Sequence, residues 1–179
     1  MKRCIGVTKI SHHTYKAKVL FHALLLLSLF LIILPNAASA AMHYVRAGAT
    51  GANNGSDWTN AYTALPSTLV RGDTYYIADG TYPAYSFDDA VSGSTYIYIK
   101  KATTDAHGTE TGWINAYGDG QAIFTGGAAY SLSISNSYWD IDGVSGGGPP
   151  SSWTSGHGFK ITGLTAGKPL IKFNGAVTN

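Results

Sequence analysis

The sequence predicts an all-β fold, a parallel β-solenoid whose short strands stack coil upon coil. The first observation is compositional: 21 of the 22 glycines, 11 of the 12 tyrosines and all 4 tryptophans lie after residue 40. Glycine, tyrosine and threonine are poor helix formers, so this part of the chain favours strands and turns over long helices. The second observation is a short recurring unit, in which an apolar, a variable, an apolar and a small polar residue precede a glycine.

Four copies of this unit follow one another at irregular spacing. They occupy residues 122–126, 139–143, 159–163 and 171–175. Alternation along a strand puts the apolar residues on one face, and these are Phe124, Trp139, Ile141, Phe159, Ile161, Ile171 and Phe173. A strand of three to five residues is too short to be stable alone, but stacked on a copy of itself it buries its apolar face. Irregular spacing suits a solenoid with loops of variable length.

The remaining elements are expected in a simple order. Residues 43–46 form a first strand, and the Gly- and Asn-rich residues 47–57 form a loop. We expect a short helix over residues 59–65, capped by Thr59 or Asn60 and ended by Pro66. Further strands are expected near residues 75–77, 96–100 and 132–134, where apolar and polar side chains alternate.

Residues 1–40 read as a secretory signal peptide. They carry five basic residues and no acidic one, followed by an apolar run at residues 19–34. Small residues at 38 and 40 predict cleavage between Ala40 and Ala41; a cut one residue later fits nearly as well. The alternative is an uncleaved membrane anchor, but the apolar run is short for a span. We expect a protein that is secreted, periplasmic or on the cell surface, with no membrane attachment after cleavage.

Four segments carry a resemblance to a known family. They are YVRAG at 44–48, RGDTYYIADGTY at 71–82, YIYIKKA at 96–102 and SYWDIDG at 137–143. Their order resembles the N-terminal part of right-handed parallel β-helix proteins of the pectate-lyase-like superfamily, which includes secreted bacterial polysaccharide lyases. The resemblance implies that residues 41–179 are the N-terminal part of a right-handed β-helix domain truncated at its C-terminus. It also implies that the helix at 59–65 caps the open end of the solenoid.

Outward-facing side chains supply the candidate ligand-binding residues. Three lysines follow inward-facing apolar positions, and two tyrosines precede the first of them along its strand; the candidates are Tyr96, Tyr98, Lys100, Lys160 and Lys172. On stacked coils they could form one strip that holds an anionic polysaccharide by charge pairing and ring stacking. The alternative is an ordinary solvated face, with lysines that protect a sheet edge.

Two carboxylates are the candidate metal ligands. Asp140 and Asp142 alternate outward on one strand, and oxygen ligands suit calcium, which some lyases of the resembled fold use. No cofactor is otherwise evident, and calcium is expected only in a longer parent protein. Asp105, His107 and Glu110 form a weaker candidate, for which a solvated loop is the simpler interpretation.

Two classes of function remain open. The first is an exported carbohydrate-interacting protein, the N-terminal section of a polysaccharide lyase acting on an acidic polysaccharide, whose catalytic residues the sequence does not assign. The second is a non-catalytic surface stalk, adhesin or glycan-binding module. The basic pI does not indicate a nucleic-acid partner, because residues 41–179 hold seven basic and ten acidic residues, a net charge of 7 − 10 = −3.

Overall fold

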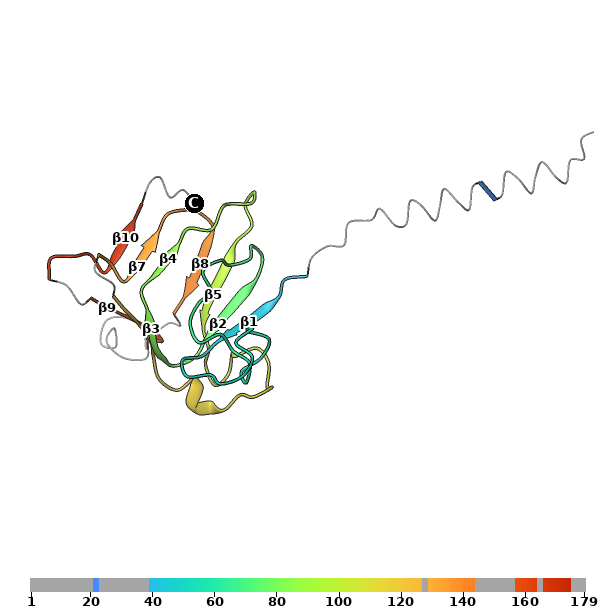
Figure 1. Cartoon of the computed structure of the whole chain (residues 1–179), viewed down its shortest axis with the longest axis horizontal. Helices are drawn as coiled ribbons and strands as arrows, with labels where there is room; N and C mark the ends of the chain where they lie inside the picture. Colours follow the sequence, from blue (N-terminus) through green and yellow to red (C-terminus); the bar gives the residue numbers. More distant parts are fainter. Residues whose placement is uncertain (1–20, 23–38, 127–128, 144–156, 164–165, 175–179) are drawn as a thin grey trace, which may run out of the picture. The chain divides into compact units, whose positions relative to one another are not determined.

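The computed structural model describes residues 21–22, 39–126, 129–143, 157–163 and 166–174. Most of the predicted signal peptide lies outside these residues. The chain divides into two units, Met1–Ser39 and Ala40–Asn179, and the strands of the described residues lie in the second (Figure 1). No helix among the described residues is long and apolar enough to cross a membrane.

The strands form three parallel sheets (Figure 1). The first sheet has the order β1 (Met42–Val45), β2 (Thr74–Ile77), β5 (Ile97–Lys101) and β8 (Trp139–Asp142). The second has the order β3 (Gly80–Pro83), β6 (Ala122–Thr125) and β9 (Phe159–Thr162), and the third the order β4 (Tyr85–Phe87), β7 (Leu132–Ile134) and β10 (Ile171–Phe173). After β1, the chain visits the first, second and third sheets in turn, three times over, which is the path of a parallel β-solenoid.

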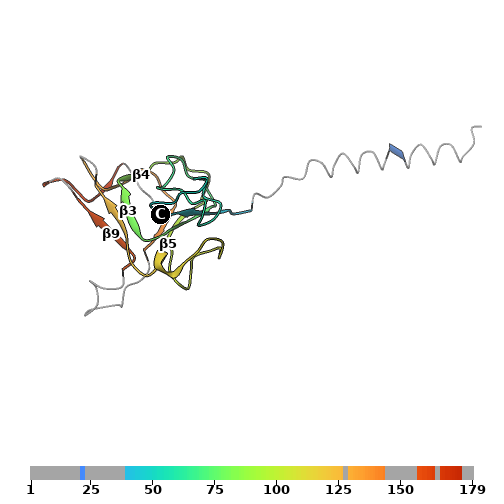
Figure 2. The ribbon, with the colours of Figure 1, turned by 60° about the horizontal axis from the view of Figure 1, so that its bottom comes forward.

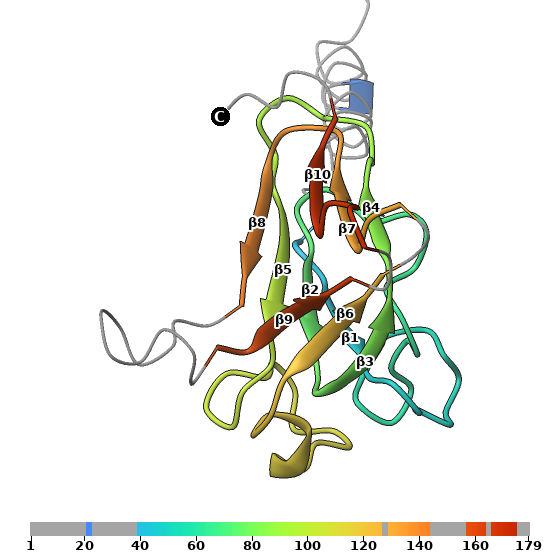
Figure 3. The same cartoon turned by 90° about the vertical axis from the view of Figure 1, so that its left-hand side faces the viewer.

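The stacking brings segments far apart in sequence side by side. Figure 3 shows β8, β5 and β2 in one layer, with β9, β6 and β3 in another. Figure 2, from a different side, separates β3 and β9 from β5 of the first sheet. The register is continuous from coil to coil, because Tyr75 pairs with Ile99 and Ile99 pairs with Ile141.

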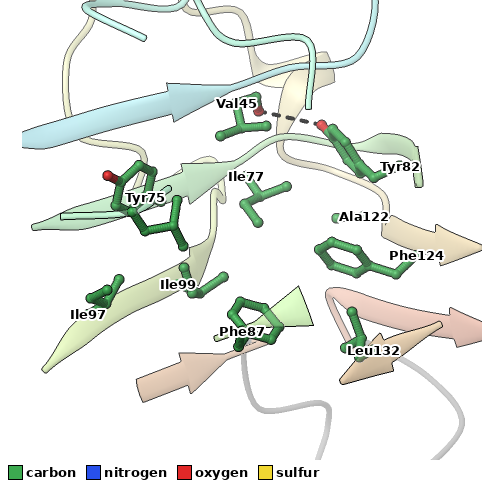
Figure 4. Close-up of a cluster of buried hydrophobic side chains, with 11 residues drawn as sticks. Val45, Tyr75, Ile77, Tyr82, Phe87, Ile97, Ile99, Ala122, Phe124 and Leu132 are labelled. Carbon is green, nitrogen blue, oxygen red and sulfur yellow. Dashed lines mark hydrogen bonds between the residues drawn. The ribbon is translucent and has the colours of Figure 1, made fainter. Parts of the chain in front are cut away.

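The core lies between the three sheets. Figure 4 shows buried side chains that converge from all of them; the buried cluster is Val45, Leu69, Tyr75, Ile77, Tyr82, Phe87, Ile97, Ile99, Ala122, Phe124 and Leu132. Trp139, Ile141, Phe159 and Ile161 pack against this cluster, so the predicted inward face is confirmed for them. Each large aliphatic side chain buried here contributes about 1.5–3 kcal/mol of transfer free energy.

The last coil differs from this pattern. Ile171 and Phe173 of β10 are 40% and 65% exposed. Both pair in register with β7 on one side, but β10 is an edge strand of the third sheet. The alternation of the sequence therefore predicts which residues share a face but not whether a further layer covers that face.

The expected capping helix over residues 59–65 is wrong. These residues form bends and one parallel bridge, between Tyr62 and Val45. Tyr62 donates its backbone N–H to Tyr44 O at 2.8 Å and accepts from Arg46 N at 2.8 Å, so its backbone extends the β1 edge. Asn60 is held by the Asp57 carboxylate instead of capping a helix. A helix of two turns has marginal stability without tertiary support. The backbone N–H and carbonyl of Tyr62 instead form hydrogen bonds with the backbone of Tyr44 and Arg46.

Candidate functional site

Three tyrosines form an aromatic surface at the start of β5 and β8. The Tyr96 and Tyr98 rings stack with centroids 6.2 Å apart, and the Tyr138 ring meets Tyr96 edge-on at 5.5 Å. Tyr96 is 38% exposed. We call Tyr96, Tyr98 and Tyr138 the aromatic platform. The Tyr98 and Tyr138 side chains are half-buried. Tyrosine rings at a surface offer apolar faces with hydroxyl tips, which suit the faces of sugar rings.

Charged side chains continue the platform along the same outer face. Tyr98 pairs in register with Asp140, and Lys100 pairs with Asp142 on the neighbouring strand. The Lys100 ammonium also lies 5.8 Å from the Tyr98 ring centroid, within cation–π range. A residue rise of about 3.3 Å places Lys100 about 13 Å along the strand from Tyr96. The first sheet thus gathers two predicted tyrosines, one predicted lysine and both predicted carboxylates.

The rest of this outer face is covered by loops. Tyr44 and Tyr76 project from β1 and β2 in register and stack at 6.1 Å. Trp58 is fully buried against Tyr44 at 4.9 Å, and Trp113 lies 4.8 Å from Trp58. This second aromatic cluster packs the loops against β1 and β2. The platform and the charged side chains beside it lie on the part of the face away from this cluster.

Arg71 fixes the backbone under the platform. Its guanidinium donates to the carbonyls of Ser137 and Tyr138 at 3.1 and 2.7 Å, and it lies over the Trp139 ring at 4.6 Å. It also donates to Asp89 O at 2.7 Å. Tyr138 has a φ of 65°, a left-handed conformation that costs free energy in a residue with a large side chain. The guanidinium holds that conformation, and with it the direction of the Tyr138 ring.

The other two predicted lysines lie elsewhere. Lys160 is on β9 of the second sheet and Lys172 on β10 of the third, both exposed. The structure therefore does not bring Lys100, Lys160 and Lys172 onto one strip. The reason is that each coil contributes one short strand to each of the three sheets. Segments with the same sequence motif can therefore lie in different sheets.

The metal candidates are incomplete as sites. Among the described residues no group of three His, Cys, Asp or Glu side chains lies close enough to hold a metal ion. Asp140 and Asp142 supply two carboxylates, fewer than the six to eight oxygens that calcium takes. His107 is used structurally, because Nδ1 lies 3.1 Å from Thr103 O, Nε2 lies 3.1 Å from Glu110 Oε1, and the ring stacks on Trp113 at 4.0 Å.

Sequence reasoning missed a buried ion pair at the far end of β5. Lys101 is 3% exposed. Its ammonium lies 2.6 Å from Asp79 Oδ1 and donates to Ala102 O. The other Asp79 oxygen accepts from Gly120 N at 2.5 Å. The alternation that points Ile97 and Ile99 inward also points Lys101 inward, and this signal could have found it.

A hollow of about 280 Å³ opens beside this ion pair. It is lined by Lys101, Thr103, Gly118, Asp119, Gly120, Gln121, His157 and Gly158. The Nε2 atom of His157 is buried and has no hydrogen-bond partner within the described part of the chain. The Gln121 amide orients this segment by donating to His157 O at 2.8 Å. The volume is near the lower end of small-molecule sites.

The three stacked parallel sheets place the protein in the class of parallel β-solenoids. Comparison with protein-family models, with curated proteins and with solved structures finds no match to the chain. Two places in the structure offer functional chemistry: the aromatic platform and the hollow beside Lys101.

Proposed function

We propose that this protein is an exported, carbohydrate-binding β-helix, right-handed as in the pectate-lyase-like superfamily, that holds a polysaccharide on the outer face of its first sheet. The observation that carries the proposal is the aromatic platform with Lys100 beside it. Rings from two coils provide successive stacking positions, and about 13 Å of strand gives room for more than one sugar residue.

The charge of this face constrains the ligand. Lys100 contributes one positive charge, whereas Asp140 and Asp142 contribute two negative charges. Such a face repels a polyuronate unless a cation screens the carboxylates. Calcium shared between Asp140, Asp142 and the uronate carboxylates would reverse this repulsion, with ligand and water completing its shell. Binding of an acidic polysaccharide should therefore require calcium, whereas binding of a neutral one should not.

Catalysis is the second candidate, and the buried Lys101–Asp79 pair beside the hollow favours it. A lyase needs a base to remove the proton next to a uronate carboxylate and a positive group to stabilise the developing charge. Lys101 as an ammonium paired with Asp79 suits the second role and not the first. His157 lines the same hollow with a buried Nε2 atom that has no hydrogen-bond partner among the described residues, so it is the candidate base. The binding module remains the first candidate, because the platform gathers three rings and the charged side chains on one face.

The test is affinity for immobilised glycans, measured with and without calcium. Alginate, pectate, chondroitin and a neutral glucan serve as ligands. Removal of the ring in Tyr98→Ala should weaken binding about tenfold, a loss of about 1.4 kcal/mol of binding free energy. Tyr130→Ala is the matched control, because Tyr130 contacts Ser86 of the third sheet instead. Lys100→Ala should also weaken binding, whereas Lys160→Ala and Lys172→Ala should not.

The same samples separate the two candidate functions. Lyase action yields an unsaturated uronate that absorbs ultraviolet light, so growth of absorbance that is lost in Lys101→Met would support catalysis at the hollow. Affinity that is unchanged in both Tyr96→Ala and Tyr98→Ala would refute the carbohydrate platform.

A further inference from the structure

A buried carboxylate lies at the point where the folded unit begins. Asp73 is 7% exposed. Its Oδ1 accepts a hydrogen bond from the backbone N–H of Ala41 at 2.9 Å, and its Oδ2 lies 2.9 Å from His43 Nε2. In the uncleaved chain the Ala41 nitrogen is a neutral peptide amide. A buried carboxylate gains most from a positively charged partner, and the amide does not provide one.

Ala41 is held in place by its own backbone as well. Its carbonyl accepts from Thr74 N at 2.9 Å, one step before the register pair of Met42 and Thr74. Ala41 therefore belongs to the edge of the first sheet, although its side chain is exposed. Ser39 and Ala40, which precede it, are also exposed. The bond that the sequence predicts to be cut thus joins an exposed residue to one anchored in the fold.

We propose that cleavage between Ala40 and Ala41 creates an α-ammonium group that forms an ion pair with Asp73, so that the mature N-terminus is a structural part of the first coil. In the cleavage, water adds across the peptide bond. Ala40 leaves with the new carboxylate, and the Ala41 nitrogen becomes an amine that takes up a proton. The new group occupies the position of the former amide and replaces a neutral hydrogen bond with a charge-assisted one, which is about twice as strong.

The contacts of Ala41 also favour one of the two cleavage positions that the sequence leaves open, before or after Ala41. A cut after Ala41 would remove the nitrogen that faces Asp73 and the carbonyl that pairs with Thr74 N. Asp73 would then keep His43 as its partner. A cut before Ala41 preserves both backbone contacts. The inference is independent of the carbohydrate proposal, since it rests on the start of the chain and not on the platform.

Two titratable side chains face Asp73, and the experiment must separate them from the amine. His43 contacts the carboxylate directly and stacks on the Tyr75 ring at 4.6 Å. Tyr75 is close enough that the negative charge of Asp73 adds to the rise of its pKa. A readout specific to the α-amine of Ala41 avoids both groups.

The experiment uses protein exported from the full-length chain. Mass spectrometry of the N-terminal peptide should identify Ala41 as the first residue. Acetylation of that α-amine near neutral pH should proceed about tenfold more slowly in the wild type than in Asp73→Asn, because the ion pair keeps the amine protonated. Asp105→Asn, which removes an exposed carboxylate from the loop that follows β5, should react at the wild-type rate.

The outcomes that overturn the proposal are equally direct. A first residue of Met42, retention of Cys4, or equal acetylation rates in wild type and Asp73→Asn would each do so. Should Asp73→Asn fail to fold, NMR titration of the wild-type amine decides the matter. A pKa within the ordinary range of about 7.7–8.0 for an α-amino group would refute the ion pair, and a higher value would support it.

Discussion

At the residue scale, glycines decide the path of the loop that replaces the expected capping helix. Gly55 has a φ of 71°, and a side chain there would collide with the Tyr62 ring. Its carbonyl accepts from Tyr44 N at 3.0 Å, which ties the loop to β1. Gly48 has a similar φ of 76°, but a side chain there would meet nothing within 4 Å. Both positions thus require a positive φ, but only Gly55 is packed against another side chain.

This difference predicts unequal costs of the same substitution. Gly48→Ala should lower the free energy of unfolding by about 1–2 kcal/mol, the cost of a left-handed conformation in a residue with a Cβ. Gly55→Ala should lower it by about 3 kcal/mol, because displacement of Tyr62 adds an overpacking cost. Denaturant unfolding of both variants measures the difference. Equal destabilisation would show that Tyr62 moves aside freely.

At the element scale, short strands are held together by side chains that bridge coils. Arg71 lies before β2 and bonds to the carbonyls that precede β8, so it spans the strand order of the first sheet through β5. Arg46 has a smaller role, with a bond to Trp58 O at 3.2 Å and a position 4.6 Å from the Tyr117 ring. Both arginines use planar guanidinium geometry that an ammonium cannot reproduce.

Arg71→Lys should therefore be costly. We expect a loss of about 2–3 kcal/mol of unfolding free energy, since several carbonyl bonds are lost together. Arg46→Lys, the matched control, should cost about 1 kcal/mol. Thermal unfolding gives the stabilities, and glycan affinity of the folded Arg71→Lys protein should also fall because Tyr138 loses its support. An Arg71→Lys protein as stable as Arg46→Lys would contradict this role.

At the scale of the whole molecule, each sheet contributes at least one tyrosine whose side chain is buried or half-buried. Burial raises the pKa of Tyr75 in the first sheet to about 12. Burial also raises the pKa values of Tyr82 in the second sheet and Tyr85 in the third. Tyr82 donates to Ala78 O at 2.9 Å and Tyr85 donates to Pro66 O at 2.7 Å, bonds that need the protonated phenol.

These shifts predict alkaline unfolding. A group whose folded pKa lies above its unfolded value of 10.0 contributes stability that is fully present below pH 10 and is lost as pH rises toward the folded pKa. The protein should thus be stable to about pH 10 and then unfold cooperatively as these phenols ionise together. Tyrosinate absorbance and circular dichroism, followed in one titration, should change in the same pH range.

A matched variant tests the assignment to individual tyrosines. Tyr75→Phe should reduce the slope of stability against pH above pH 10, because one fewer proton is released on unfolding. Ionisation of all tyrosines near pH 10 with the β-sheet signal retained would contradict the burial of these hydroxyls.

The sequence alone determined the architecture of the coils. Alternation and the terminal glycine located β6, β8, β9 and β10, and the inward positions of Trp139 and Ile141 followed from the period of two. The same alternation placed Tyr98, Lys100, Asp140 and Asp142 on an outer face. These properties are local, since strand periodicity is set by neighbouring residues along the chain.

Only the tertiary structure decided which of these faces meet. The register between β5 and β8 sets Lys100 beside Asp142, and the coil path sends Lys160 and Lys172 to other sheets. Tyr62 forms a bridge with Val45 of β1 where the sequence favoured a helix, because the neighbouring strand supplied better backbone partners. The contact of Ala41 with Asp73 likewise spans 32 residues. Such contacts depend on how the coils stack. Packing against the neighbouring coil stabilises one register over the others, and the periodicity of a single strand does not specify which register that is.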